Sequence, residues 1–211
     1  MEKMSFRTLT MANEIDLVLE KIEIFSGVRL PLEYIRQSKT VGVFLQDRLV
    51  ACYILVTKPN FRSLLFVPDK LKLTNKFFNR DQYEMMEVNG LWIGPALKKP
   101  SMQVKVWMHL ILDIFSCKKK YVLLMHDSRN KSMERFLDMA NPEKLYAGSP
   151  LPMAGESTHK KIQVSYTTRW SIVLNIPKYL LELHRRQLRV GQFDKERTYT
   201  RALQNTDAEL A

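Results

Sequence analysis

The order of elements between Glu84 and Ala140 limits the possible folds of this chain more than any other stretch of its sequence. Glu84 to Ile93 is extended and apolar, and a loop from Ala96 to Gln103 follows it. Val104 to Cys117 is apolar on almost every side, which indicates a helix that is covered by other elements. A strand, a loop and a covered helix in this order favour an α/β fold.

The next two elements continue this alternation. Tyr121 to Met125 is a short, fully apolar stretch and predicts a buried strand. Asp127 or Ser128 is expected to cap the helix that follows. Apolar residues recur in that helix at i, i+3, i+4 and i+7, namely Met133, Phe136, Leu137 and Ala140.

The N-terminal part predicts a hairpin preceded by a strand and two helices. The expected elements are a strand over Phe6 to Thr10, a helix capped by Asn13 and running to about Phe25, a short helix over Leu32 to Gln37, and strands over Val41 to Leu45 and Leu49 to Val56. The polar link Gln46-Asp47-Arg48 joins the last two as a hairpin. Their nearly continuous apolar runs indicate a sheet that is covered on both faces.

The remaining stretches are less regular. Lys58 to Gln82 is expected to be a long connection, in which Leu64 to Val67 reads as a further strand. Ile162 to Ile176 reads as one long strand or two, and an amphipathic helix follows Pro177. The chain is therefore divided into one α/β domain over residues 1–176 and a basic amphipathic helical tail over residues 177–211.

Composition excludes several classes of protein. Of the 211 residues 45% are hydrophobic, and only 7 are glycine and 9 proline, so collagen-like and disordered chains are excluded. No apolar stretch approaches the roughly 20 residues of a membrane-spanning helix, and no secretory signal is visible. Cys52 and Cys117 are expected to be buried thiols in a reducing compartment. The sequence thus predicts a soluble, cytoplasmic protein, and its scattered histidines and cysteines predict no metal site.

The chain is strongly basic. Thirty-three Lys and Arg residues against 22 Asp and Glu give a formal charge of +11. Such a charge attracts anionic partners, namely nucleic acid, a phospholipid surface, nucleotide phosphates or an acidic protein. Charge alone does not choose among these partners.

The loop before the covered helix is a candidate phosphate site. A strand that feeds a helix points backbone N–H groups and the positive end of the helix dipole at the loop, where Lys98 and Lys99 add charge. Walker-type and dinucleotide fingerprints are absent because no glycine occurs between Gly94 and Gly148. The alternative is an ordinary connection with solvated lysines.

From about Phe6 to Ile176 the order of elements resembles that of the GNAT-type N-acyltransferases. In that family the fourth strand ends near a hydrophobic-x-Pro, which Ile93-Gly94-Pro95 matches. The family's (Arg/Gln)-x-x-Gly-x-(Gly/Ala) loop holds the pyrophosphate of coenzyme A, and Lys98 to Gln103 occupies its place, with Ser101 and Gln103 at the two small positions. The resemblance implies a single GNAT-like domain with a mixed, mostly antiparallel central sheet flanked by helices, plus a C-terminal helical extension.

The resemblance also implies a set of donor-binding residues. These are the end of the fourth strand, the loop, the first helical turn after it and the Asn that follows the fifth strand: Ile93, Lys98, Lys99, Ser101, Met102, Gln103, Val104 and Asn130. The family frequently has a Tyr seven residues after that Asn as general acid. Leu137 stands there in this chain, so the acid is supplied elsewhere or is missing.

Two residues are candidates for catalysis. The family often uses a carboxylate of the fourth strand as general base, and Glu87 lies there; the alternative is a solvated carboxylate at the sheet edge. His126, at the end of a central strand, is the second candidate. His109 and Asp113 lie one helical turn apart and form either a His–carboxylate dyad or a solvated polar stripe.

The sequence thus predicts an N-acyltransferase that moves an acyl group from a thioester to an amine acceptor. The donor is expected to be an acyl-CoA or the phosphopantetheine of an acyl carrier protein. An acidic carrier suits the charge of +11, and its single phosphate demands less of a loop without glycines. The alternatives are a catalytically inactive GNAT-like binding or scaffold module and a basic protein that binds nucleic acid or a membrane surface.

Overall fold

The computed structural model describes residues 3–97, 99–149 and 161–185, except for the side chain of Ser132. The predicted site residue Lys98 and most of the predicted tail lie outside this part of the chain.

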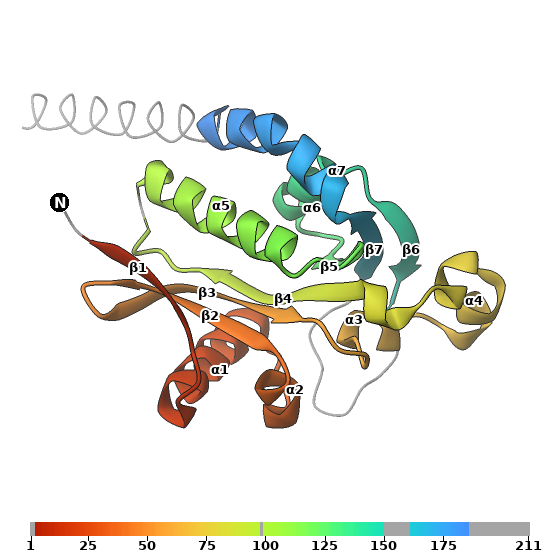
Figure 1. Ribbon diagram of the computed structural model, residues 1–211, viewed down its shortest axis with the longest axis horizontal. Coiled ribbons are helices and arrows are strands. Elements are labelled where there is room, and N and C mark those ends of the chain that lie inside the picture. The colour runs from red at the N-terminus through yellow and green to blue at the C-terminus, as the bar shows by residue number, and fades with distance from the viewer. Residues whose placement is uncertain (1–2, 98, 150–160, 186–211) are drawn as a thin grey trace, which may run out of the picture.

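A seven-stranded sheet forms the centre of the molecule (Figure 1). Its strands are β1 (Met4–Thr8), β2 (Lys39–Leu45), β3 (Arg48–Val56), β4 (Met85–Ile93), β5 (Tyr121–Asp127), β6 (Glu143–Gly148) and β7 (Ile162–Thr168). They are ordered β1-β2-β3-β4-β5-β7-β6, and β4 with β5 is the parallel pair among otherwise antiparallel neighbours. The predicted α/β fold with a mixed, mostly antiparallel sheet is confirmed.

The predicted hairpin of β2 and β3 is confirmed, with a turn one residue shorter than the predicted link because Arg48 belongs to β3. Leu45 pairs with Arg48, so Gln46 and Asp47 are the two turn residues, and both have positive φ, 51° and 60°. Two consecutive residues with positive φ match the turn that best suits the right-handed twist of a two-residue hairpin.

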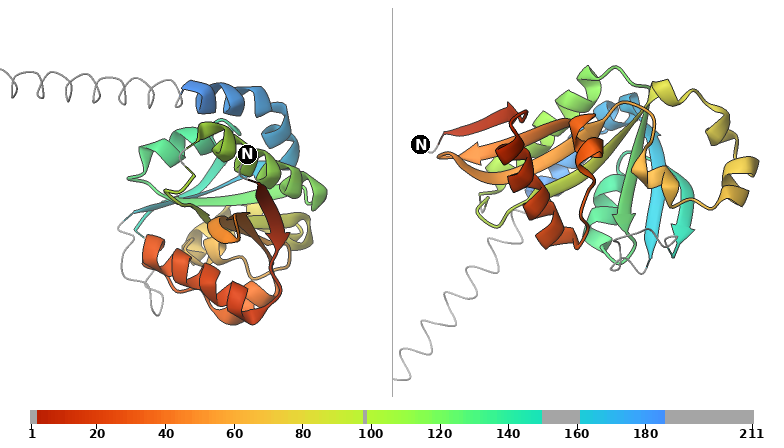
Figure 2. Two further views of the ribbon diagram at one scale, coloured as in Figure 1. Left: turned by 90° about the vertical axis from the view of Figure 1, so that its left-hand side faces the viewer. Right: turned by 90° about the horizontal axis from the view of Figure 1, so that it is seen from below.

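Helices cover both faces of the sheet, as Figures 1 and 2 show. One face is covered by α1 (Ala12–Ser26), α2 (Leu32–Arg36) and α3 (Arg62–Leu65), and the other by α5 (Pro100–Ser116), α6 (Lys131–Asp138) and α7 (Arg169–Leu174). The rest of the long connection between β3 and β4 forms α4 (Asp69–Thr74) and two short 3₁₀ helices, η1 (Lys76–Asn79) and η2 (Gln82–Glu84).

Each face of the sheet has its own hydrophobic core. Under α1 to α3 the core includes Val18, Ile54 and Leu123, and under α5 to α7 it includes Tyr53, Val122 and Leu110. Neighbouring strand residues such as Val122 and Leu123 thus point into different cores, which explains the continuous apolar runs of the central strands.

Two stretches that read as strands are partly helical. Leu64 and Leu65 are the last two residues of helix α3, whose first turn is held by a carboxylate of a distant strand, described below. Ile162 to Ile176 changes from strand to helix at Thr168, whose hydroxyl accepts the backbone N–H of Ser171 and caps α7. The strand β6 was not predicted, because it lies at the edge of the sheet and only Leu145 of its six residues is buried.

Three helix starts also differ from the prediction. Helix α1 begins at Ala12 after Met11, so Asn13 lies in its first turn rather than at the cap position. Helix α5 begins at Pro100, four residues before Val104, because proline suits the first turn of a helix. Helix α6 is capped by Asn130 rather than by Asp127 or Ser128. The Asp127 carboxylate instead accepts hydrogen bonds from the backbone and the guanidinium of Arg129.

Helical residues continue after α7 through 176–185. Tyr179 and Leu183 are buried there, and the Tyr179 ring lies 4.8 Å from that of Phe136, so this part of the predicted tail packs onto the domain. Across the described residues, no helix combines the length and the apolarity that crossing a bilayer requires. Cys52 is buried as predicted, whereas Cys117 is only partly buried, and both are free thiols.

Candidate active site

The parallel strands β4 and β5 pair over three positions and then part. The paired residues are Met85 with Tyr121, Met86 with Val122 and Glu87 with Leu123. Beyond them β4 runs to Ile93 and β5 to Asp127 without further pairing to each other. The separation leaves a gap in the middle of the sheet and leaves backbone N–H and C=O groups along its two sides.

A β-bulge at Gly90 marks this gap. The register between β3 and β4 shifts between Cys52 and Ile54, and Gly90 has a φ of 56°. A Cβ atom on Gly90 would lie 2.6 Å from Cδ1 of Ile54 and 2.7 Å from Cδ1 of Ile22. Only glycine fits this conformation and this space, and the bulge bends β4 where it leaves β5.

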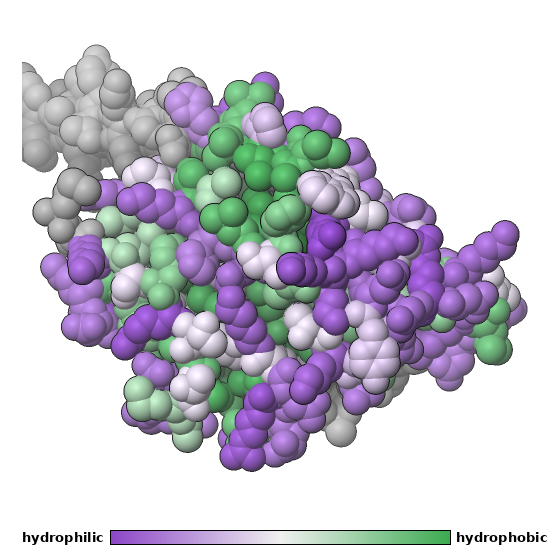
Figure 3. Space-filling view, in the orientation of Figure 1, coloured by the Kyte–Doolittle hydropathy of each residue, from purple (hydrophilic) through white to green (hydrophobic). Residues whose placement is uncertain are grey.

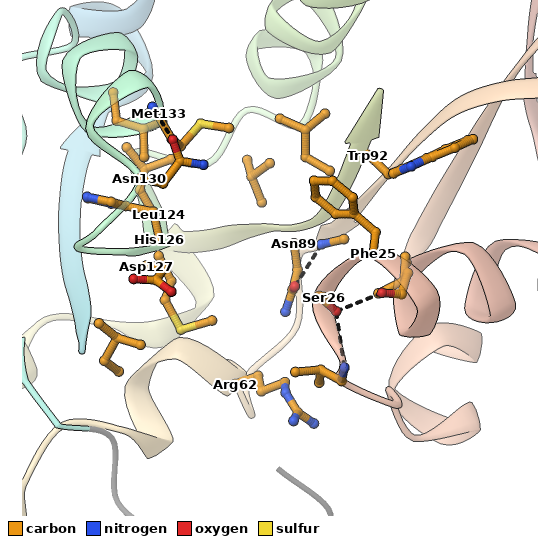
Figure 4. Close-up of a pocket in the computed structure, with 18 of the residues that line it drawn as sticks. Phe25, Ser26, Arg62, Asn89, Trp92, Leu124, His126, Asp127, Asn130 and Met133 are labelled. Atoms are coloured by element: carbon orange, nitrogen blue, oxygen red, sulfur yellow. Dashed lines mark hydrogen bonds between the residues drawn. The ribbon is translucent and has the colours of Figure 1, made fainter. Parts of the chain in front are cut away.

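A cavity of about 670 Å³ fills the gap (Figure 4). Its apolar wall comes from α1, β4, β5, α6 and the segments between them, and includes Phe25, Phe66, Val88, Leu124, Met133 and Leu137. The polar groups on the wall are fewer and include Ser26, Arg62, Asn89, His126, Asp127 and Asn130. A mostly apolar cavity with a few convergent polar groups is typical of a ligand site.

His126 lines the cavity from the end of β5, and its side chain is buried. Neither Nδ1 nor Nε2 has a hydrogen-bond partner among the described residues. Burial lowers the pKa of His126 below its ordinary value, although Glu134 and Asp138 on α6 act in the opposite direction. The ring is therefore neutral near pH 7, and a neutral imidazole can accept a proton.

Asn130 joins the cavity to the start of α6. Its Oδ1 accepts the backbone N–H of Met133 at 3.0 Å and caps the helix. In Figure 4 the amide nitrogen of Asn130 points toward the centre of the cavity. The side chain thus fixes the helix start with one atom and presents a hydrogen-bond donor with the other.

Glu87, the predicted general base, is 1% exposed and does not line the cavity. Its carboxylate accepts the backbone N–H groups of Arg62 at 2.8 Å and of Ser63 at 2.9 Å, which belong to the first turn of α3. The Tyr34 hydroxyl donates to the same carboxylate, and Asn89, which lines the cavity, donates to Tyr34. Burial raises the pKa of Glu87, and the backbone N–H groups oppose this shift. A catalytic role for Glu87 stays a prediction, and the geometry adds a structural role.

The predicted donor loop lies beside the cavity rather than on its wall. Ile93 ends β4, Lys99 is exposed just before α5, and Ser101, Met102, Gln103 and Val104 form the first turns of α5. The Gln103 amide turns back and donates to the Leu97 carbonyl at 2.8 Å. Where the family loop has a small residue, this chain therefore has a side chain that ties the loop to the helix.

His109 and Asp113 form part of a network on α5 rather than a solvated stripe. The Tyr53 hydroxyl lies 2.7 Å from both His109 Nδ1 and Asp113 Oδ2, and Lys39 donates to Asp113 at 2.7 Å. The His109 ring stacks on Phe6 with centroids 4.0 Å apart. These residues lie outside the lining of the cavity.

Sequence reasoning missed most of the apolar wall. The sequence predicts Phe25 and Met133 only as parts of helices, yet both line the cavity. Phe25 is 67% exposed. An aromatic residue at the end of an amphipathic helix was the one feature of the sequence that could have indicated this part of the cavity wall. No group of three or more His, Cys, Asp or Glu side chains in the described ranges could hold a metal ion.

Comparison with known proteins gives a fold but no close relative. No protein-family model matches the chain, and no curated protein matches its sequence. Solved structures do match. FeeM, an N-acyl amino acid synthase from uncultured soil microbes, superposes with a TM-score of 0.58 at 9% identity, over 80% of this chain and 92% of FeeM.

Two acetyltransferase structures match less closely. A probable acetyltransferase from Staphylococcus epidermidis gives a TM-score of 0.52 at 11% identity, over 79% of this chain and 99% of the other. The yncA protein of Salmonella typhimurium, solved with its cofactor acetyl-CoA, gives a TM-score of 0.51 at 9% identity, over 79% of this chain and 94% of yncA. The chain therefore has the fold of the GNAT-type N-acyltransferases, as its order of elements indicated.

Proposed function

We propose that the protein is an N-acyltransferase that moves an acyl group from a thioester to an amine. The observation that carries this proposal is the cavity between the parted ends of β4 and β5. The fold shared with FeeM and with the acetyltransferases supports the same class of reaction.

The donor is proposed to lie between the two strands. The amide groups of a pantetheine arm match the unpaired backbone groups on both sides of the gap, as an added strand would. Its phosphate would then lie near Lys99 and the start of α5, where the helix dipole favours negative charge. The acyl group would extend along the apolar wall of the same cavity, and such a wall favours acyl chains longer than acetyl.

An acyl carrier protein is the donor that we favour over free coenzyme A. The loop lacks glycines, and the Gln103 side chain ties it to the Leu97 carbonyl. The pyrophosphate of coenzyme A would have to approach this loop closely, whereas the phosphopantetheine of a carrier brings a single phosphate. A carrier is also acidic, which complements the charge of +11.

His126 is proposed as the proton acceptor. The amine nitrogen attacks the thioester carbonyl carbon, a C–N bond forms, the C–S bond breaks and the sulfur leaves as a thiolate. His126 takes the proton from the attacking nitrogen and can return it to the thiolate. Both of its ring nitrogens are enclosed in this structure, so this transfer requires the ring to turn toward the bound amine. Backbone N–H groups along the gap would stabilise the charge that develops on the carbonyl oxygen. Glu87 holds α3 in place, and it also holds Asn89 in place through the hydroxyl of Tyr34.

Amino acids are the first acceptors to test, because FeeM is an N-acyl amino acid synthase. The experiment incubates the full-length chain with acyl-CoA or acyl carrier protein of several chain lengths and with each amino acid. Thiol release and the mass of the N-acyl product are measured. We expect turnover with a long-chain carrier donor, reduced about 100-fold or more in His126→Gln.

Matched controls make the outcome decisive. Leu73→Gln changes a residue that is 88% exposed on α4, far from the cavity wall, and should keep full turnover. Absence of thiol release with every donor and acceptor, in a protein that still folds, would contradict the proposal and favour a binding module. Turnover with free acyl-CoA alone would leave the reaction intact and refute the carrier as donor.

A further inference from the structure

A group of large apolar side chains is exposed on the face of the molecule opposite α1 and α2. Leu112 and Phe115 lie on α5, and Trp170 and Leu174 lie on α7, with exposed fractions of 59%, 38%, 54% and 75%. We call these four residues the α5–α7 patch. Figure 3 shows hydrophobic side chains gathered over α5 and the helices that follow β7.

The patch is continuous across the two helices. The rings of Phe115 and Trp170 contact each other edge to face, with centroids 5.2 Å apart. Leu112 lies three residues before Phe115 and Leu174 four residues after Trp170, which is one helical turn in each case. The core does not need these side chains, because α5 and α7 bury other residues, among them Ile111, Ile114 and Ile172.

Basic groups border the patch. The Arg169 guanidinium carbon lies 5.7 Å from the ring centroids of both Phe115 and Trp170. The backbone N–H of Arg169 donates to the Lys120 carbonyl, whereas the side chains of Lys119 and Lys120 contact the Tyr83 carbonyl and the Glu84 carboxylate instead of the patch. Lys178 is exposed four residues beyond Leu174. Aromatic and aliphatic side chains thus share one surface with the cations of Arg169 and Lys178.

We propose that the α5–α7 patch docks on a lipid bilayer that contains anionic headgroups. Such a surface offers both chemistries that the patch needs, because tryptophan and leucine enter the interface while arginine and lysine pair with phosphates. A second copy of the chain fits less well, since it would bring its own charge of +11 to the same place. Docking would be peripheral, on the surface of the bilayer. None of the four residues lines the cavity, so this inference does not depend on the proposed reaction.

The test is flotation of the full-length chain with vesicles of pure phosphatidylcholine and with vesicles that also contain phosphatidylglycerol. We expect binding to the anionic vesicles, weakened by salt and much weaker on the neutral ones. Leu174→Glu should lower the partition coefficient about tenfold or more, because it removes one inserted side chain and adds a repelled charge. Trp170→Ser should act in the same direction.

Leu73→Glu is the matched control, because Leu73 is an 88% exposed leucine among lysines on α4, outside the patch. Equal loss of binding in Leu73→Glu and Leu174→Glu would show general charge attraction and overturn the proposal. Absence of binding to anionic vesicles would overturn it too. The proposal would also be overturned if the chain did not bind vesicles but self-associated, and if Leu174→Glu abolished this self-association. The patch would then be an interface between copies of the chain.

Discussion

The phenol of Tyr34 donates a hydrogen bond to the carboxylate of Glu87, 53 residues further along the chain, at 3.2 Å. The same carboxylate accepts two backbone N–H groups from the first turn of α3. One buried acidic side chain therefore joins α2, the long connection after β3 and the strand that borders the cavity. This arrangement allows a structural role and a catalytic role of Glu87 to be separated.

Glu87→Gln is expected to destabilise the fold. The new amide NH₂ would face one of the two N–H donors of α3, so that a buried donor loses its acceptor, at a cost of about 1–3 kcal/mol. Tyr34→Phe keeps both backbone hydrogen bonds and should cost about 1 kcal/mol. Urea unfolding measures both values. If Glu87→Gln unfolds like the unaltered chain but loses turnover, Glu87 is the base that the sequence predicted.

Replacement of His126 tests the proton acceptor. His126→Gln keeps a polar side chain in the cavity wall but cannot take a proton from an amine. We expect kcat to fall by about 10²–10⁴, with little change in the KM of the donor. The acidic limb of the pH–rate profile, which for a pKa lowered by burial lies below 6.5, should disappear in the variant. A variant with full kcat and an unchanged acidic limb would exclude His126 from the chemistry.

The same residue should make stability depend on pH. The unfolded chain has a His126 pKa near its ordinary value of 6.5, and the folded chain a lower one. Between these two values the unfolded state binds more protons, so the free energy of unfolding falls as the pH drops below about 6.5. Burial also lowers the pKa of His109, which adds a pH dependence of its own. The contribution of His126 is therefore the difference in the free energy of unfolding between the unaltered chain and His126→Gln at each pH. If the free energy of unfolding depended on pH with the same slope in the unaltered chain and in His126→Gln, the prediction would be wrong.

Gly90→Ala should be strongly destabilising. The substitution places a Cβ at a φ of 56° and within 2.7 Å of Ile22 and Ile54, and such strain costs about 1–3 kcal/mol. Gly27→Ala is the matched control, since Gly27 has a φ of 70° but is exposed at the end of α1. Thermal unfolding should show the larger loss for Gly90→Ala, and similar losses would mean that crowding at the bulge is unimportant.

A larger side chain at Met133 should change donor preference. Met133→Trp adds volume to the apolar wall of the cavity, so long acyl donors should lose at least roughly tenfold in kcat/KM relative to acetyl donors. Met11→Trp is the control, because Met11 is 59% exposed and far from the wall. An equal loss for acetyl and long-chain donors would place the acyl chain elsewhere.

The parts of the fold that depend on local patterns could be predicted from the sequence. The hairpin turn at Gln46 and Asp47, the covered helix after Gly94-Pro95 and the apolar strand from Tyr121 follow from periodicity and turn residues. The order of these elements gave the resemblance to the GNAT-type N-acyltransferases, and that resemblance implied the arrangement of the sheet, which the structure confirms.

The parts that depend on distant partners could not be predicted. Leu64 to Val67 has the composition of a strand, yet Leu64 and Leu65 are helical, because Glu87 on another element accepts the backbone N–H groups at the start of α3. Asn130 rather than Asp127 caps α6, because Arg129 occupies the Asp127 carboxylate. The cavity wall likewise needs the bulge at Gly90, and a single glycine in a strand does not reveal where its neighbours will lie.

The three paired positions between β4 and β5 also bear on how the chain folds. They join two antiparallel ladders, β1 to β4 and β5 to β7, across a crossover that contains α5. Closing the crossover of residues 94–120 costs about as much entropy as closing the connection of residues 57–84 between β3 and β4, but it gains only three paired positions where β3 and β4 gain five. We therefore expect the ladders to form first and their junction last. The cavity would then come into existence only in the final step of folding, and ligand binding would report that step directly.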